Sequence, residues 1–212
     1  MIQLKSFVFS DFQENTYLLY SGKDCLIIDP GCFTPDEKSQ LHTFIEKNNL
    51  SPQMVLYTHC HPDHIFGASY LAQNFPGIIF KAHNEEEAVL KVNKQLAMVL
   101  GITIEKPPSL SGFINEGDII PLGKSRIKTL HVPGHSPGSI CYYLESEKML
   151  FAGDVLFAGS IGRTDLPGGN YDMLITNIRK KLLTLPDDVV VYSGHGSATT
   201  IGNEKRYNPF FR

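Results

Sequence analysis

Residues 58–64, which read Thr-His-Cys-His-Pro-Asp-His, hold four side chains that can bind a metal ion. Imidazole and carboxylate groups are ligands that zinc takes in proteins, and they also suit iron and manganese. If the chain before Pro62 is extended, His59 and His61 project to the same side. Pro62 favours the start of a helix, so Asp63 and His64 would project from its first turn. The spacing therefore predicts two ligands aimed at one point and two aimed at a neighbouring point.

Three further candidate ligands each follow a predicted strand and have glycine beside them. His135 lies within residues 133–138 (Pro-Gly-His-Ser-Pro-Gly), Asp154 follows a glycine, and His195 lies between two glycines. Glycine lets the backbone turn sharply and approach a site closely, and strand ends are where a rigid sheet positions functional groups. A lone histidine is usually a surface or packing residue, but seven groups in this arrangement predict a metal centre.

The remaining histidines and one cysteine have simpler interpretations. His42 lies on a predicted helix and is expected to be solvated. His83 precedes the acidic residues 85–87, which are favoured at a helix N-terminus. His131 lies in a predicted strand and is expected to pack or to support the site. Alternation turns Cys60 away from its two histidine neighbours, so we expect it to be buried and inert.

The elements that position these groups follow from hydrophobic periodicity and from turn residues. The long strand-like runs, broken by helices, predict an α/β protein in which sheets pack on each other beneath helices. Residues 102–115 contain two consecutive prolines and a glycine and are expected to be mostly loop. Strands are predicted near 4–9, 16–20, 25–28, 54–57, 78–81, 119–122, 127–131, 140–144, 149–152 and 189–192, and helices over 34–48, from Pro62, over 85–100 and over 170–185.

Composition narrows the class of protein. The 212 residues are 42% hydrophobic and 19% charged, which is ordinary globular usage, and no linker separates two halves, so one domain over 1–212 is expected. The net charge of −3 predicts no nucleic-acid partner. No apolar run approaches the ~20 residues that span a bilayer, so no membrane partner is expected. No secretory signal is visible, and the four cysteines form no CxxC pair, which favours reduced thiols in the cytoplasm.

In combination, these motifs resemble the metallo-β-lactamase superfamily and, within it, the glyoxalase II-like (hydroxyacylglutathione hydrolase-like) hydrolases. The resemblance covers nearly the whole chain, and it implies a four-layer αβ/βα sandwich with the site at one edge of the two sheets. It is carried by Asp29-Pro30-Gly31, the HxHxDH segment, residues 133–139, Gly153-Asp154 and Gly194-His195-Gly196.

The resemblance also implies a role for each candidate residue. Two metal ions per chain are expected, most simply zinc, with iron or manganese as alternatives. Asp154 would bridge the two metals, and Asp29 would support the ligand loop. The first metal would be held by His59, His61 and His135, and the second by Asp63, His64 and His195.

The activity that the resemblance implies is hydrolysis of a small acyl thioester such as S-lactoylglutathione. A metal-bridging hydroxide would be the nucleophile, oriented by Asp63. A thiolate with a pKa near ~8.5 leaves with little help from an acid. Arg163 aligns with a basic position that contacts glutathione, although a structural salt bridge is an equally good interpretation. The chain stops before the helical domain of full-length glyoxalase II and has Ser197 in place of a tyrosine, so loose glutathione binding is expected.

Other activities remain open. Persulfide dioxygenases share these motifs but use one iron, here held by His59, His135 and Asp154, a set that suits oxygen chemistry. Residues 162–165 occur in both groups and do not discriminate. True β-lactamases generally lack the bridging aspartate, and RNA-processing members carry an inserted domain that this length excludes. A non-catalytic metal-binding module would be favoured by a missing ligand, and none is missing. The sequence leaves the oligomeric state open.

Overall fold

Several strands of this protein are buried on both faces, because each sheet is covered by helices on one side and by the other sheet on the opposite side. In β3 (Asp24–Ile28), Cys25 and Ile27 face one apolar cluster while Leu26 and Ile28 face another. This alternation is what a strand buried on both sides requires. The computed structural model describes residues 2–99 and 101–212.

The N-terminal half builds the first sheet, whose strand order is β1-β2-β3-β4-β5-β6. The pairs β1–β2 and β2–β3 are antiparallel. From β3 to β6 each strand is parallel to the next, and helices connect them. The other elements of this half are β1 (Gln3–Phe9), β2 (Glu14–Ser21), α1 (Pro35–Lys47), β4 (Ser51–Leu56), the 3₁₀ turn η1 (Pro62–His64), α2 (Ala68–Asn74), β5 (Ile79–Ala82), α3 (Glu86–Val99) and β6 (Gly112–Phe113).

The C-terminal half builds the second sheet, in the order β14-β13-β10-β9-β8-β7. Only β10 and β13 are parallel; the other neighbours are antiparallel. Its elements are β7 (Ile119–Leu122), β8 (Ser125–His131), β9 (Ile140–Leu144), β10 (Met149–Gly153), the hairpin β11 (Leu156–Phe157) and β12 (Ser160–Ile161), α4 (Tyr171–Asn177), the π-helical turn η2 (Ile178–Leu182), β13 (Val190–Ser193), β14 (Thr199–Thr200), α5 (Ile201–Tyr207) and the 3₁₀ turn η3 (Pro209–Phe211).

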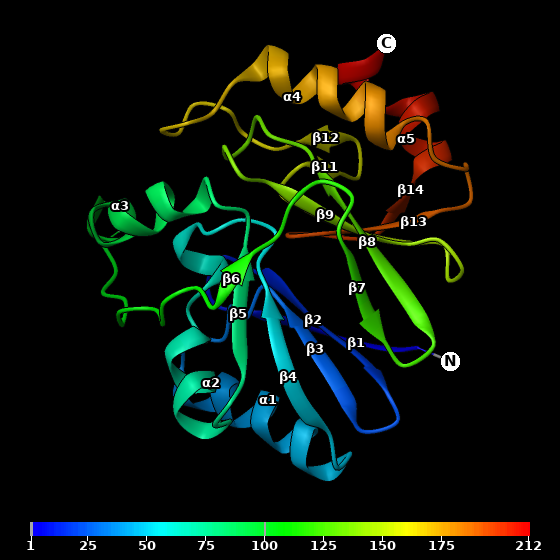
Figure 1. Cartoon of the computed structure of the whole chain (residues 1–212). Helices are drawn as coiled ribbons and strands as arrows, with labels where there is room; N and C mark the ends of the chain where they lie inside the picture. The colour runs from blue at the N-terminus through cyan, green and yellow to red at the C-terminus, as the bar shows by residue number, and fades with distance from the viewer. Residues whose placement is uncertain (1, 100) are drawn as a thin grey trace.

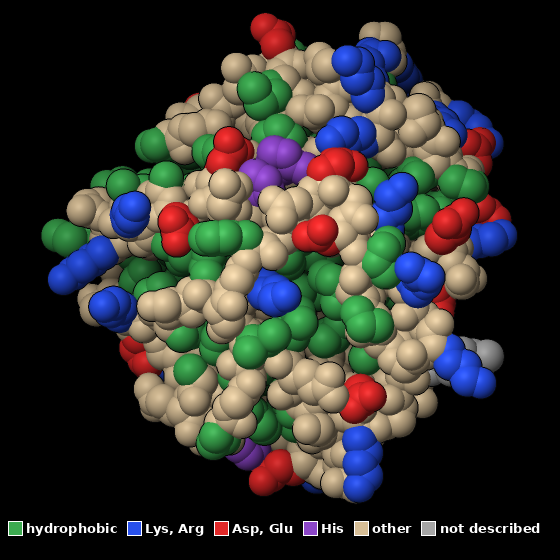
Figure 2. All heavy atoms as spheres, viewed as in Figure 1, with side chains coloured by type: hydrophobic (Ala, Val, Ile, Leu, Met, Phe, Trp, Pro, Cys, Tyr) green, Lys and Arg blue, Asp and Glu red, His purple; other side chains and the backbone are tan. Residues whose placement is uncertain are grey.

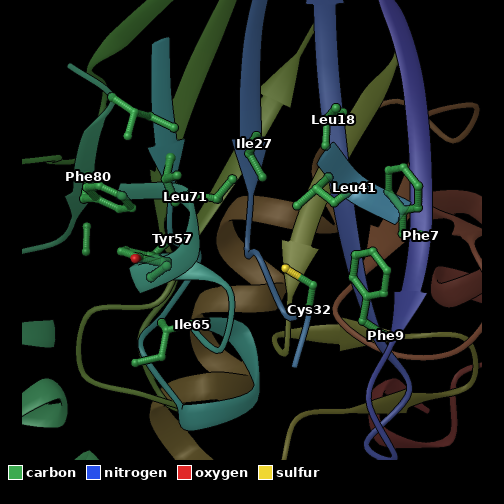
Figure 3. Close-up of a cluster of buried hydrophobic side chains, with 14 of the residues drawn as sticks. Phe7, Phe9, Leu18, Ile27, Cys32, Leu41, Tyr57, Ile65, Leu71 and Phe80 are labelled. Carbon is green, nitrogen blue, oxygen red and sulfur yellow. The ribbon is translucent and has the colours of Figure 1, made fainter. Parts of the chain in front are cut away.

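Three apolar clusters hold the layers together. The first lies between the first sheet and helices α1 and α2, and includes Leu18, Leu41 and Leu71 (Figure 3). The second lies between the second sheet and α4, η2 and α5. The third lies between the two sheets, where Tyr142 and Phe151 are fully buried. Three cores between four layers make the αβ/βα sandwich that the sequence predicted, and Figure 1 shows α1 and α2 on one outer face and α4 and α5 on the other.

The structure corrects several predicted elements. Pro62 begins a single 3₁₀ turn rather than an α-helix, and α2 starts only at Ala68. The predicted helix over 170–185 ends as an α-helix at Asn177 and continues as a wider π turn. The short strands β6, β11, β12 and β14 and the helix α5 were not predicted, because elements of two to seven residues carry too little periodicity. The predicted end of the helix over 85–100 reaches residue 100, which lies outside the described residues.

The surface carries both signs of charge. On the face shown in Figure 2, Lys and Arg side chains are scattered among acidic and apolar ones. All four cysteines are free thiols and buried. Within residues 2–99 and 101–212, no helix has the length and apolar character that crossing a bilayer requires.

Candidate metal centre

The seven predicted ligands converge where strands of both sheets end. The loop after β4 carries His59 and His61, and η1 carries Asp63 and His64. The β8–β9 loop supplies a histidine, and the ends of β10 and β13 supply an aspartate and another histidine. Two groups of three have their ligand atoms within 4.8 Å of one another: His59, His61 and His135, and Asp63, His64 and His195.

The first group brings three imidazole nitrogens together with no acid between them. His135 Nε2 lies 3.0 Å from His61 Nδ1 and 3.1 Å from His59 Nε2. All three histidines are buried. Nitrogen ligands at ~2.0–2.1 Å from a tetrahedral ion would lie only slightly further apart than this. The donor set and its spacing therefore fit one transition-metal ion.

The second group combines two imidazoles with a carboxylate. Asp63 Oδ2 lies 3.2 Å from His195 Nε2 and 3.7 Å from His64 Nε2. The His64 side chain is fully buried, whereas His195 is partly exposed. A mixed nitrogen and oxygen set of this kind also suits zinc, iron or manganese.

Asp154 lies between the two groups. Its Oδ1 is 3.5 Å from His64 Nε2, and its Oδ2 is 3.7 Å from His135 Nε2 and 3.6 Å from His195 Nε2. Asp154 Oδ1 and His64 Nε2 are buried without a hydrogen-bond partner. Buried polar atoms left without a partner are costly, so these two atoms fit a bound cation. The position of Asp154 is the one that a bridging ligand would occupy.

Four of the five histidines among the predicted ligands form a contact through Nδ1, the ring nitrogen that faces away from the centre. The Nδ1–H of His135 donates to the carbonyl of Arg163 at 2.8 Å, and that of His195 to the carbonyl of Phe12 at 3.0 Å. A carbonyl only accepts, so each Nδ1 carries a proton, and Nε2 is the nitrogen left to bind a metal ion. Such partners fix the tautomer and ring orientation of metal ligands. In the same way His59 donates to Thr58 Oγ1 and His64 to Asp29 Oδ2.

Asp29 supports the ligand loop through hydrogen bonds. Its carboxylate accepts from the Thr58 backbone N–H at 2.7 Å, from the Thr58 hydroxyl and from His64 Nδ1 at 3.1 Å. The Asp29 backbone has φ +47°, a left-handed conformation that aspartate tolerates better than most residues. This turn directs the buried carboxylate back towards the loop, so Asp29 acts on the centre through its neighbours.

Burial keeps the first group neutral. It lowers the pKa of His59 well below its usual value and that of His61 to about 3, and it also lowers the pKa of His135. Neighbouring imidazoles lower the first two pKa values further, chiefly His64 for His59 and chiefly His135 for His61. At neutral pH the three rings are therefore unprotonated, which is the form that binds a metal ion.

In the second group, the neighbouring charges shift the pKa values in the direction that keeps the side chains charged. Burial opposes the charge on His64, but Asp63 and Asp154 raise its pKa well above the usual value. Burial likewise opposes the charge on both carboxyls, but the nearby His64 brings their pKa values below the usual range. Both aspartates are therefore ionised and able to serve as ligands at neutral pH.

Glu86 is a buried carboxylate that ties the two ligand loops together. It accepts from the Cys60 N–H at 2.6 Å, between His59 and His61 in the chain, and from the Gly138 N–H at 2.8 Å and the Ser136 hydroxyl, beside His135. Its side chain is fully buried in the first turn of α3. Glu86 therefore fixes the distance between the loops that carry the first group.

Asn93, two turns further along α3, donates to the Cys60 carbonyl at 2.6 Å. Neither α3 residue was predicted from the sequence, because residues 85–87 have the character of an acidic helix start. The available signal was periodicity: Glu86 and Asn93 share the buried face of α3 with Val89 and Ala97. Two polar residues on an otherwise apolar face indicate buried partners.

A cavity of about 240 Å³ opens beside the centre. Arg163 lines this cavity, but its guanidinium also forms two 2.8 Å contacts with the carboxylate of Asp165. Both interpretations of Arg163 thus have a structural basis. Five of the predicted ligands line the cavity as well: His61, Asp63, His135, Asp154 and His195.

Three other groups lie away from the centre. The His83 and His131 rings stack at 4.0 Å with Glu85 nearby, but His131 Nε2 already contacts the Pro137 carbonyl at 3.0 Å. His42 is not freely solvated as predicted, because its Nδ1 contacts the Tyr70 hydroxyl at 2.9 Å. Cys60 is buried, and burial raises the pKa of its thiol well above the usual value.

Gly194 lets the last histidine loop pass close to the centre. A Cβ at this position would lie 2.2 Å from Asp154 Oδ1 and 2.8 Å from the His64 ring. Only glycine leaves room for both side chains, which explains the residue that precedes His195.

Comparison with known proteins agrees with this geometry. A model of the metallo-β-lactamase superfamily matches residues 10–195. The chain is similar to the hydroxyacylglutathione hydrolase GloC of Haemophilus influenzae, with 40% identity over 206 residues that cover 94% of this chain and 93% of that protein.

Two solved structures share the whole architecture. BLEG-1, described as a B3 metallo-β-lactamase, has a TM-score of 0.89 and 36% identity, with 99% of both chains covered. TTHA1623, solved in a di-iron-bound form, has a TM-score of 0.88 and 34% identity, with 97% of this chain and 99% of that chain covered.

The position of Asp154 predicts different metal losses in two variants. Asp154→Ala should lower the occupancy of both metals, because Asp154 faces ligands of both groups. His195→Ala should mainly empty the second group. Metal content after dialysis, measured by elemental analysis, separates the two patterns. Full occupancy of both sites in both variants would contradict the assignment.

The contacts of Glu86 predict that Glu86→Gln weakens metal binding about 10- to 100-fold, the range for residues that support metal ligands. The glutamine has the same size, but one of its ends would be an NH₂ group facing a backbone N–H or hydroxyl donor. Competition with a chelator measures the affinity, and circular dichroism checks the fold. Glu85→Gln, one residue earlier and exposed, is the matched control and should leave the affinity unchanged. Equal affinities of Glu86→Gln and the parent protein would refute the role.

Proposed function

The chain belongs to the metallo-β-lactamase superfamily and is a metal-dependent hydrolase, and from this premise we propose that it cleaves small acyl thioesters at a two-metal centre. The observation that carries the proposal is the position of Asp154 between two complete groups of ligands. The second group is complete as well, with its own two imidazoles and carboxylate, and two complete groups favour two metals over one.

Zinc is the metal that we propose for both positions. Three imidazoles, and a carboxylate with two imidazoles, are sets that zinc binds readily. Iron is the main competitor, because the similar TTHA1623 was solved in a di-iron-bound form. When bound, two metals supply an activated water near neutral pH and polarise a carbonyl oxygen.

The residues of the chain supply the remaining requirements. Asp63 lines the cavity and is ionised, because His64 and His195 lower its pKa against the effect of burial. Its carboxylate can therefore orient the attacking water by accepting a proton in a hydrogen bond. The water oxygen bonds to the acyl carbon, the C–S bond breaks, and the products are a carboxylic acid and a thiol. The thiol leaves as a stable thiolate, so no dedicated general acid is needed.

S-lactoylglutathione is the first substrate that we propose to test. The name of GloC supports it, since that relative is described as a hydroxyacylglutathione hydrolase. Arg163 offers a positive charge at the cavity for an anionic end of glutathione. The Arg163 side chain is 60% exposed and paired with Asp165, so this contact should be weak. We therefore expect turnover with a high KM.

The alternatives predict different reactions. A mononuclear iron dioxygenase would bind its metal through His59, His135 and Asp154, and Asp63 and His195 would then hold no metal. A β-lactamase is a second candidate only because BLEG-1 carries that description. A non-catalytic metal-binding module would not need the cavity that opens beside the ligands.

The proposal predicts loss of S-lactoylglutathione absorbance with zinc-loaded protein. Arg163→Ala should raise KM about three- to fivefold with kcat nearly unchanged, since an exposed ionic contact contributes little and acts equally on substrate and transition state. Asp165→Asn is the matched control, because it breaks the same salt bridge but keeps the guanidinium. It should not raise KM.

Three assays decide between the reactions. Oxygen uptake with glutathione persulfide by iron-loaded protein, without thioester cleavage, would replace the hydrolase with a dioxygenase. Cleavage of a chromogenic cephalosporin without thioester cleavage would favour a β-lactamase. Metal-loaded protein inert in all three assays would favour the non-catalytic module.

A further inference from the structure

Helix α3 has a buried face and an apolar face that is left partly open. Glu86, Val89, Asn93 and Ala97 form the buried face. On the adjacent side of the helix, Val92 and Val99 are 40% and 85% exposed, and Leu96 is half-buried. A soluble helix normally places charged or polar residues on its open face. The exposed apolar side chains of α3 therefore indicate something apolar that covers them.

The open face of α3 continues into the cavity at the metal centre. Leu96 and Val99 line this cavity together with Phe12, Leu166 and the five ligand side chains. One end of the cavity is thus a cluster of imidazoles and carboxylates, and another wall is aliphatic. In Figure 1, α3 projects beyond the sheets on the same side as the segment that leads into α4. The residues of this segment that line the cavity are Arg163 and Leu166.

The aliphatic wall has a fixed position relative to the metal ligands. Glu86 accepts from the Cys60 N–H at 2.6 Å, and Asn93 donates to the Cys60 carbonyl at 2.6 Å. Cys60 lies between His59 and His61 in the chain. The same helix therefore holds the ligand loop with one face and presents Leu96 and Val99 to the cavity from the adjacent side. A carbonyl at the metal centre would place its substituent at a defined distance from this wall.

We propose that Leu96 and Val99 select thioesters with a short apolar acyl chain. This inference rests on the proposed thioester hydrolysis and narrows its substrate class. The cavity volume of about 240 Å³ lies below the range of ~300–1,000 Å³ that holds drug-sized ligands, so the chain is short rather than lipid-like. The reaction is unchanged: water adds its oxygen to the acyl carbon, the C–S bond breaks, and a carboxylic acid and a thiol are released.

A series of acyl lengths on one thiol tests this selection. We expect kcat/KM to rise about two- to fourfold per added methylene from S-acetyl- to S-butyryl- to S-hexanoylglutathione, the gain that burial of a methylene gives. In the Leu96→Ala and Val99→Ala variants, kcat/KM should differ by no more than about twofold across the series. Alanine is the best helix former, so neither change should unwind α3.

Binding without turnover gives a second readout. Calorimetry with the stable thioethers S-methyl- and S-hexylglutathione should show tighter binding of the hexyl compound, by about tenfold or more, with a negative heat-capacity change. Both wall variants should lose this difference. Met98→Ala is the matched control, because Met98 neighbours Val99 and is 69% exposed but does not line the cavity. It should retain both the series and the difference in binding.

The outcomes separate the two levels of the proposal. Cleavage of S-lactoylglutathione with a flat acyl series would overturn the apolar selection and leave the thioester hydrolase standing. No cleavage of any thioester would overturn both. A dimer that both Met98→Ala and Val99→Ala dissociate, with no effect of Val99→Ala on the series, would assign this face to a second copy of the chain and overturn the selection.

Discussion

The contact on which the rest of the structure depends is the approach of unprotonated imidazole nitrogens to one another. His135 Nε2 lies 3.0–3.1 Å from nitrogens of His61 and His59, and burial keeps all three rings neutral. Lone pairs at this distance repel each other unless a cation lies among them. The protein brings them together because their backbones are fixed by strand ends of two sheets. The folded structure therefore holds these nitrogens together against their mutual repulsion, and a bound metal ion would remove the repulsion.

Two kinds of support keep this arrangement in place. Carbonyl, hydroxyl and carboxylate groups hold the outer nitrogens of four histidines, so the inner nitrogens face the centre. Asp29 and Glu86 hold the loops themselves: Asp29 reaches up from the end of β3, and Glu86 reaches across from α3. Both carboxylates are buried and ligate nothing directly in this arrangement. Their effect is to fix where the ligand loops lie, and through α3 this fixed geometry extends to the wall of the substrate cavity.

The sequence predicted the parts of this arrangement that local spacing controls. The four potential ligands of residues 58–64, and glycine-flanked ligands after later strands, sufficed to predict which side chains converge. The long strand-like runs predicted sheets packed on each other beneath helices, and the resemblance to the metallo-β-lactamase superfamily implied the four-layer arrangement. Glu86 and Asn93 escaped prediction because their partners are backbone groups 26 and 33 residues away, which no local pattern reveals. The π turn after Asn177 and the cavity wall of α3 also depend on tertiary packing. Spacing alone does not assign Arg163 either, because Asp165, two residues away, and a substrate can both use its charge.

The central claim is that the seven side chains hold two metal ions through the bridging position of Asp154. Elemental analysis of the protein as purified without added metal, and again after saturation and dialysis, measures this most directly. We expect two metal ions per chain after saturation, and zinc as the main element before it. One iron per chain and no second metal under any loading condition would contradict it, because the group of Asp63, His64 and His195 would then bind nothing.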